Sequence, residues 1–350
     1  MTSKYRHSDL TDCATELFTR AGADPGIAEV MAEVLVEADL LGYTTHGLLF
    51  ATPFVEGLES GSFTPSGLPE FLKESSGTMV VDGRWLPGQW VMTWTLGEML
   101  SKAQQVPVVT AVVRRAQNIA CLAVYARRLA MRGLVGMVMA SAPANEAVAP
   151  HGGKAPRYST NPLAMGIPAP DHPILIDTST SSASNREVER NRRAGTRLAH
   201  PSLVSNKGKA STDPAVMLSN PPGAILPAGG MDWGHKGFAF GLMVEALTSC
   251  LGGFGRGSLP EAKGNNIFVQ VIDPDAFGGR SDLLRETGHL GEHLRNTPPQ
   301  KADQPVRVPG DRAAAAYEEQ TSQGVALHPE IMPRLEPLLK KYKIKPPKPV

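Results

Sequence analysis

Between residues 78 and 272, short β-branched runs alternate with helical segments, and this alternation constrains the fold of the chain most strongly. Strand-like runs occupy residues 79–81, 108–113, 134–139, 174–177 and 266–272, and helical patterns cover residues 96–105 and 122–132. A sheet with helices packed against it is the usual arrangement of such a series. The pattern therefore predicts an α/β fold.

Helical segments are expected on both sides of this region. Asp24-Pro25 is a helix start with an acidic N-cap and a proline in the first turn, and Gly42 is a suitable end. The residues between them follow the apolar period of an amphipathic helix. Further helices are predicted over residues 9–21 and 48–56, with a kink at Pro53. Polar residues 185–220 predict an irregular excursion, and the last 75 or so residues predict helices with Pro/Gly breaks.

We expect three regions. Residues 1–75 form a helical N-terminal segment that packs with the C-terminal segment. Residues 76–255 form an α/β cofactor-binding region, and residues 256–350 contribute a strand and the helical C-terminal segment.

Charge and cysteine content limit the function classes. The chain has 35 basic and 34 acidic residues among 350, so it lacks the basic field typical of nucleic-acid or membrane binding. The polar start, residues 1–12, does not resemble a signal peptide, and no run approaches the ~18 apolar residues of a membrane span. Three widely separated cysteines, Cys13, Cys121 and Cys250, fit a reducing, cytoplasmic setting.

A glycine-rich tetrapeptide, Gly234-His235-Lys236-Gly237, precedes an apolar stretch over residues 238–251 that is expected to be helical. If the tetrapeptide opens that helix, free N–H groups, the helix dipole and the Lys236 charge would favour a phosphate or carboxylate. A glycine-rich turn with a solvated lysine is the alternative.

Several known site motifs are absent. The chain has no G-x-G-x-x-G after a strand, no P-loop and no G-x-S-x-G elbow. The run from His289 to His293 matches the H-x-x-E-H pattern of one zinc-protease class, but Gly291 weakens the helix that the pattern requires. We interpret these residues as two surface histidines on a polar helix and expect no metal site.

Motifs spread along the chain resemble, in order and spacing, those of the type-2 malate/L-lactate dehydrogenase family. They are Ala38-Asp39-Leu40-Leu41-Gly42 with Thr45-His46-Gly47, Val148-Ala149-Pro150-His151-Gly152-Gly153, Thr160-Asn161-Pro162, Asp177-Thr178-Ser179-Thr180-Ser181, Thr212-Asp213-Pro214, Leu226-Pro227, Gly234-His235-Lys236-Gly237 and Pro309-Gly310-Asp311.

This resemblance implies the non-Rossmann α/β fold of the sulfolactate dehydrogenase-like enzymes, which would explain the missing dinucleotide fingerprint. It implies an NAD(P)-dependent oxidoreductase, usually a homodimer, that acts on 2-hydroxy/2-oxo acids, cyclic imino acids, ureidoglycolate or sulfolactate. The choice between NAD and NADP stays open.

The resemblance also implies roles for individual residues. His46 is the candidate proton donor, with Thr45 orienting its imidazole. The expected cofactor-binding residues are Asn161, Asp177, Thr178, Ser179, His235, Lys236, Gly237, Pro309, Gly310 and Asp311.

Three departures affect the expected site. A family His-containing triplet corresponds here to Asn118-Ile119-Ala120, and a family Arg that could hold a carboxylate corresponds to Phe50. The Gly of a family A-x-G-K motif is replaced, giving Asn185-Arg186-Glu187, in which Arg186 would keep the positive charge and Glu187 would supply an acid/base group. One hypothesis is a nicotinamide-dependent reductase in which Phe50 favours a larger, less carboxylate-dependent substrate, such as an aromatic one. In this hypothesis His46 carries proton transfer alone and Asn118 binds the carbonyl or imine. The other is a non-catalytic homologue.

Overall fold

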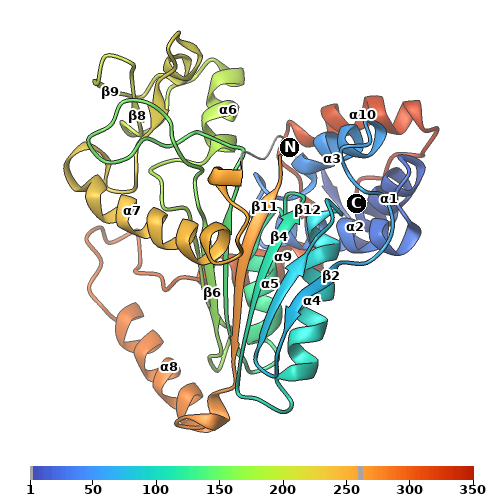
Figure 1. Ribbon diagram of the computed structural model, residues 1–350, viewed down its shortest axis with the longest axis vertical. Coiled ribbons are helices and arrows are strands. Elements are labelled where there is room, and N and C mark those ends of the chain that lie inside the picture. The colour runs from blue at the N-terminus through green and yellow to red at the C-terminus, as the bar shows by residue number, and fades with distance from the viewer. Residues whose placement is uncertain (1–2, 259–262) are drawn as a thin grey trace.

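The computed structural model describes residues 3–258 and 263–350, and a mixed sheet lies at its centre (Figure 1). Only β3 and β4 are parallel neighbours; every other neighbouring pair in this sheet is antiparallel. In order across the sheet, the strands are β2 (Glu70–Glu74), β3 (Thr78–Asp82), β4 (Val108–Ala116), β11 (Asn265–Ile272), β5 (Val135–Ser141), β6 (Leu163–Ile167) and β7 (Ile174–Thr178).

The central strands β4, β5 and β11 are largely buried on both faces, which explains their near-continuous apolar sequences. Along β4, Val109, Ala111 and Val113 join the large core, whereas Val112 points to a second cluster with Phe268 and Val244. Helices α4 (Gly88–Lys102) and α5 (Leu122–Ala130) pack against the sheet, and the π-helical turn η3 (Ala246–Cys250) packs against β4, β5 and β11. The predicted α/β arrangement is therefore confirmed.

Helices from the two ends of the chain lie together beside the sheet (Figure 1). The strand β1 (Lys4–Tyr5) pairs with β12 (Val325–Ala326), and α3 contacts α10. These helices are α1 (His7–Arg20), α2 (Pro25–Leu40), the 3-10 turn η1 (Leu48–Phe50), α3 (Ala51–Glu59), α9 (Asp311–Gln323) and α10 (Ile331–Lys341).

Helix α2 begins and ends where the sequence indicated. The Asp24 side chain accepts a hydrogen bond from the Gly26 N–H at 3.0 Å, and Gly42 has a φ of +82°, which glycine adopts easily. Pro53 lies in the first turn of α3, where its missing N–H is not needed.

The expectation of an irregular segment over residues 185–220 was wrong, since a helix occupies its first part. Helix α6 (Asn185–Ala194) is capped by Ser184, whose hydroxyl accepts from the Glu187 N–H at 3.1 Å, and it ends at Gly195. Ion pairs from Glu189 to Arg192 and Arg193 stabilise a helix that buries only one of its residues, Val188. Beyond it lie β8 (Leu203–Val204), β9 (Ala210–Ser211), the 3-10 turn η2 (Pro214–Leu218) and β10 (Ala224–Ile225).

The interpretation of Gly234-His235-Lys236-Gly237 as a helix start was also wrong. Helix α7 (Gly230–Glu245) begins four residues earlier, after Gly229 at a φ of +95°. The tetrapeptide lies within α7, where a Cβ on Gly237 would meet the Ala228 backbone at 2.4 Å. Close packing against a neighbouring segment explains this glycine better than a ligand does, because helical N–H groups at this position are already bonded.

The remaining long helix, α8 (Arg280–Arg295), includes His289 and His293, whose rings stack with centroids 6.2 Å apart. Among the described residues, no set of three or more His, Cys, Asp or Glu side chains is arranged to hold a metal ion. Within the same ranges, none of the helices has the length and apolar character needed to cross a bilayer.

Candidate active site

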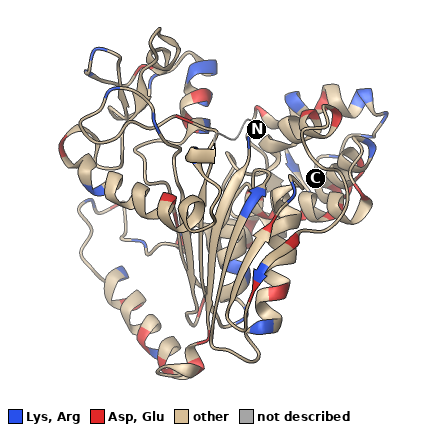
Figure 2. Ribbon diagram, in the orientation of Figure 1, with Lys and Arg blue, Asp and Glu red and all other residues tan. Residues whose placement is uncertain are grey.

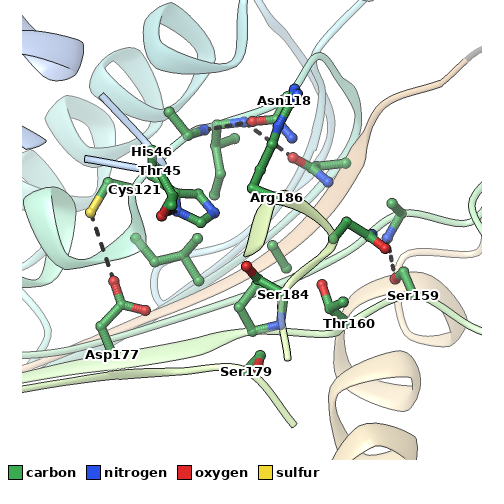
Figure 3. Close-up of a pocket in the computed structure, with 18 of the residues that line it drawn as sticks. Thr45, His46, Asn118, Cys121, Ser159, Thr160, Asp177, Ser179, Ser184 and Arg186 are labelled. Carbon is green, nitrogen blue, oxygen red and sulfur yellow. Dashed lines mark hydrogen bonds between the residues drawn. The ribbon is translucent and has the colours of Figure 1, made fainter. Parts of the chain in front are cut away.

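A cavity of about 520 Å³ lies where the loop after α2 meets the end of β7 and the start of α6 (Figure 3). Side chains that are distant in the sequence line this one space. Eight of the predicted site residues are among them: Thr45, His46, Phe50, Asn118, Asp177, Thr178, Ser179 and Arg186.

His46 is held inside the cavity wall by its neighbour in the sequence. Its Nδ1 atom lies 2.8 Å from the Thr45 hydroxyl, which leaves Nε2 for other partners. Burial first, and then the charges of Arg186 and Arg190, lower the pKa of His46 to about 4. At neutral pH the imidazole is therefore uncharged and can accept a proton.

The loop that carries His46 rests on Asp39, a buried residue of α2. Asp39 Oδ2 accepts a hydrogen bond from the Leu48 N–H at 2.7 Å, and Oδ1 has no hydrogen-bond partner among the described residues. Burial raises the pKa of Asp39 to about 7. Sequence reasoning missed this role, although Asp39 stood within the first family motif as a charged residue on an apolar helix face.

Asp177 occupies the opposite wall, at the end of β7. Its Oδ2 accepts from the Ala123 N–H in the first turn of α5 at 3.0 Å, and the Cys121 thiol lies 3.8 Å away. Burial raises the pKa of Asp177 to about 6. The carboxyl group thus faces a helix N-terminus, which favours its ionised form, while its desolvation opposes ionisation.

Two hydrogen bonds hold Asn118 in place. Its Oδ1 accepts from the Ala120 N–H at 2.9 Å, and its main-chain carbonyl accepts from the Gln89 side chain at 3.0 Å. The Nδ2 amide makes no hydrogen bond to any described residue and can donate to a ligand in the cavity.

Arg186 and Phe50 meet at one corner of the cavity. The guanidinium carbon of Arg186 lies 4.4 Å from the centroid of the Phe50 ring. Within the described ranges, Arg186 forms no ion pair, so its charge is available to an anion in the cavity. Phe50, in the expected position of a family arginine, therefore supports an arginine from another element.

Eight expected site residues do not line this cavity, and four of them lie on α6, on α7 or behind the cavity wall. Asn161 is buried behind it, where its Nδ2 donates to the Gly241 carbonyl at 2.9 Å, and Glu187 is exposed on α6. His235 and Lys236 lie on α7, where the Lys236 ammonium lies over the Trp233 ring at 4.9 Å. Their expected roles toward a cofactor or substrate stay predictions.

The turn Pro309-Gly310-Asp311 packs on β7, outside the cavity. The Pro309 carbonyl accepts from the Leu175 N–H at 3.0 Å, and Arg295 pairs with Asp311 at 2.7 Å. These contacts give the turn a packing function, and its expected cofactor contact stays a prediction, as does that of Gly237 on α7.

A network of polar side chains lies at the base of the cavity, and no sequence motif predicted it. The Ser141 hydroxyl lies 2.7 Å from both the Thr248 and the Ser249 hydroxyls of η3. Asn265, at the start of β11, accepts from the Ile119 N–H at 3.1 Å and donates to the Ser141 carbonyl. Residues from three separated elements thus fix the end of the central strands beside the cavity.

Comparison with known proteins identifies the family. A family model described as malate/L-lactate dehydrogenase matches residues 5–336 of the chain. The chain belongs to the malate/L-lactate dehydrogenase family. The resemblance drawn from the motifs is therefore confirmed, as is the expectation that the chain belongs to a family of dehydrogenases and reductases.

Individual members are distant but match along nearly their whole length. The malate/(S)-sulfolactate dehydrogenase of Methanothermus fervidus is 27% identical over 92% of this chain and 93% of its own. The Δ1-pyrroline-2-carboxylate/Δ1-piperideine-2-carboxylate reductase of Pseudomonas putida is 28% identical over 95% and 96%. The crystal structure of malate dehydrogenase from Entamoeba histolytica superimposes with a TM-score of 0.92 at 24% identity, covering 99% of this chain and 100% of that one. This likeness confirms the predicted non-Rossmann fold.

Proposed function

We propose that this protein is an NAD(P)-dependent oxidoreductase that interconverts 2-hydroxy acids and 2-oxo acids, with His46 as the group that gives or accepts the proton. The observation that carries the proposal is the imidazole of His46, oriented by Thr45 on the wall of a polar cavity. Membership of a hydroxy acid dehydrogenase family supplies the reaction class.

The cavity residues fit a nicotinamide ring. Its carboxamide requires one acceptor and one donor, and the cavity offers the Asp177 carboxyl group and the free Nδ2 amide of Asn118. The hydroxyls of Thr178 and Ser179 line the same wall. A bound nicotinamide cofactor would supply or accept the hydride, and the choice between NAD and NADP, which differ by one phosphate on the adenosine ribose, is left to experiment.

The proton chemistry follows from the charges around His46. In the oxidative direction, neutral His46 accepts the proton of the substrate hydroxyl. In the reductive direction it must be protonated, which the nearby charge of Arg186 opposes in the free protein. A substrate carboxylate bound at Arg186 offsets that charge and raises the pKa of His46. Substrate binding therefore favours the protonated form of His46 that reduction requires.

Reduction of cyclic imino acids is the second candidate. The relative from Pseudomonas putida that is named for this activity matches 95% of the chain. An imine carries a carboxylate in the same relation to the reacting carbon as a 2-oxo acid does, so Arg186 suits both. Turnover of Δ1-pyrroline-2-carboxylate but not of any 2-oxo acid would favour this alternative.

We also propose that the protein is a homodimer formed through α7. This helix exposes large apolar side chains and carries only three charged residues, and Figure 2 displays it as mostly uncharged. The exposed apolar residues of the helix are Met231, Trp233, Phe240, Leu242 and Met243. Such a row is unusual on a monomer surface. A Trp233→Glu variant that remained dimeric in analytical ultracentrifugation would contradict this interface.

A cytoplasmic location, expected from the free cysteines, stays part of the proposal.

The first experiment is a fluorescence titration of the purified protein with NADH and with NADPH. Saturable binding of one identifies the cofactor and justifies a substrate screen by loss of absorbance. If folded protein binds neither, the dehydrogenase proposal fails and the non-catalytic hypothesis replaces it.

A further inference from the structure

A side pocket of about 330 Å³ opens next to the cavity that holds His46. The two spaces share part of their walls, including Phe50, Asn118 and Arg186. Pro53, Phe54, Phe63 and Ala144 line only the side pocket. A volume of this size is within the range of small-molecule sites, about 300–1,000 Å³.

Aromatic rings form a row from the cavity into the side pocket. The ring centroids of His46 and Phe50 are 5.8 Å apart, those of Phe50 and Phe54 5.3 Å, and those of Phe54 and Phe63 5.6 Å. Phe50 ends η1, Phe54 follows one turn later on α3, and His46 lies in the loop just before η1. One wall of the side pocket is therefore aromatic and continuous with the position of the proton donor, whereas the rest of its lining includes polar residues: Gln117, Asn118, Asn145, Arg186, Lys263 and Asn265.

Two of the amide side chains in this lining already have protein partners. Gln117 donates to the Ser62 carbonyl at 2.7 Å, and both polar atoms of Asn265 are hydrogen-bonded. These two amides need no hydrogen bond from an occupant, and the neighbouring rings favour a flat aromatic group.

Arg186 lies at the junction of the two spaces. A carboxylate bound to its guanidinium would be in the main cavity near His46, and a substituent on the next carbons would extend past Phe50 into the side pocket. A 2-oxo acid whose side chain ends in a ring would occupy both spaces in this way.

Building on the proposed function, we propose that the side pocket selects 2-oxo and 2-hydroxy acids with an aromatic side chain. Reduction transfers one hydride from the reduced nicotinamide to the carbonyl carbon and one proton from His46 to the carbonyl oxygen. The products are the aryl-substituted 2-hydroxy acid and the oxidised nicotinamide.

The test compares kcat/KM for phenylpyruvate, pyruvate and oxaloacetate with whichever reduced cofactor binds. We expect phenylpyruvate to be favoured at least about tenfold, because its ring leaves water when it enters the side pocket. Ala144→Leu narrows only the side pocket and should lower kcat/KM for phenylpyruvate about tenfold more than for pyruvate. Ala144→Val is the milder variant if the leucine lowers the melting temperature, and Ala215→Leu, at an exposed position, is the matched control.

Three results would overturn the inference. Preference for pyruvate or oxaloacetate in the unmodified protein would show that no aromatic side chain is selected. Equal losses for all three acids in Ala144→Leu, with weaker NADH or NADPH binding, would assign the pocket to the cofactor. Absence of turnover with every acid despite cofactor binding would remove the proposed reaction, and this inference with it.

Discussion

The carboxyl group of Asp39 lies directly under Gly47. A Cβ placed on Gly47 would be 2.3 Å from the Asp39 carboxyl carbon, and the same carboxyl group accepts the Leu48 N–H at 2.7 Å. The loop that bears His46 thus packs closely on α2, because Asp39 accepts a hydrogen bond from the loop and Gly47 has no side chain. This contact fixes the position of the imidazole, although Asp39 itself does not line the cavity.

Gly47→Ala should therefore displace the Asp39 carboxyl group and lower both stability and turnover. Overpacking of this kind costs about 1–3 kcal/mol. Gly97→Ala is the matched control, because Gly97 is exposed on α4 with open space around it. Denaturant unfolding should show a loss for the first variant and a small gain for the second. Equal stability of the two variants would mean that the loop is not held in this way.

Asp39→Asn should change how stability depends on pH. A carboxyl group whose pKa is raised by folding contributes stability that is fully present below its unfolded pKa, near 4, and is lost as pH rises through about 7. An amide does not titrate. The stability of the variant relative to the wild type should therefore rise between pH 5 and pH 8, by about a few kcal/mol at most. The difference between the two melting temperatures at each pH measures this change. Glu29→Gln, at an exposed position of the same helix, is the control; a flat difference for Asp39→Asn would contradict the prediction.

His46→Gln should abolish most turnover and leave cofactor binding intact. Loss of a positioned proton donor costs about 10²–10⁴ in rate. Thr45→Val removes only the hydrogen bond that orients the imidazole, so its loss should be about 2–10-fold. Turnover measured under saturating cofactor, together with fluorescence titration, separates the two effects. Full turnover in the glutamine variant would require another proton donor.

Arg186→Gln should weaken substrate binding and raise the pKa of His46. The Arg186 charge lowers the pKa of His46, so its removal has the opposite sign. Because oxidation requires neutral His46, the acidic limb of kcat/KM for a 2-hydroxy acid should move to higher pH. Loss of a charge-assisted contact should also raise KM about 10–100-fold. Arg197→Gln, an exposed arginine beyond α6, should do neither; a similar profile for both variants would exclude this role for Arg186.

The cysteines should differ in reactivity with iodoacetamide at pH 7.5. Cys250 is exposed, whereas burial raises the pKa of Cys13 to about 11 and raises that of Cys121 well above its ordinary value. Since the thiolate is the nucleophile, Cys250 should be alkylated first. Mass spectrometry after timed quenching measures the order, and protein in urea should label at all three. Cys121 labelling as fast as Cys250 would mean that the cavity wall opens readily.

Local sequence was sufficient for most elements. The β-branched runs predicted β3, β4, β5, β7 and β11, and the capping residues of α2 fixed its ends. Two strands of the central sheet were missed, β2 with its polar residues and the short β6 with its glycine, because neither has a strong local preference. Helix α6 was missed because its stability comes from a cap and ion pairs.

The motifs determined the family, and they named His46, Thr45 and Asp177 without reference to any coordinates. They did not determine which motif residues lie together. His235 and Lys236 belong to an equally specific motif, yet they lie on α7, outside the cavity.

Only the tertiary structure determined the contacts and the electrostatics of the site. Phe50 and Arg186 are 136 positions apart in the chain, and their contact depends on how α6 packs over the loop after α2. The burial of Asp39 likewise depends on helices from both ends of the chain. Sequence patterns record local preference and period, whereas desolvation and charge proximity, which set the pKa of His46, arise only after distant segments pack together.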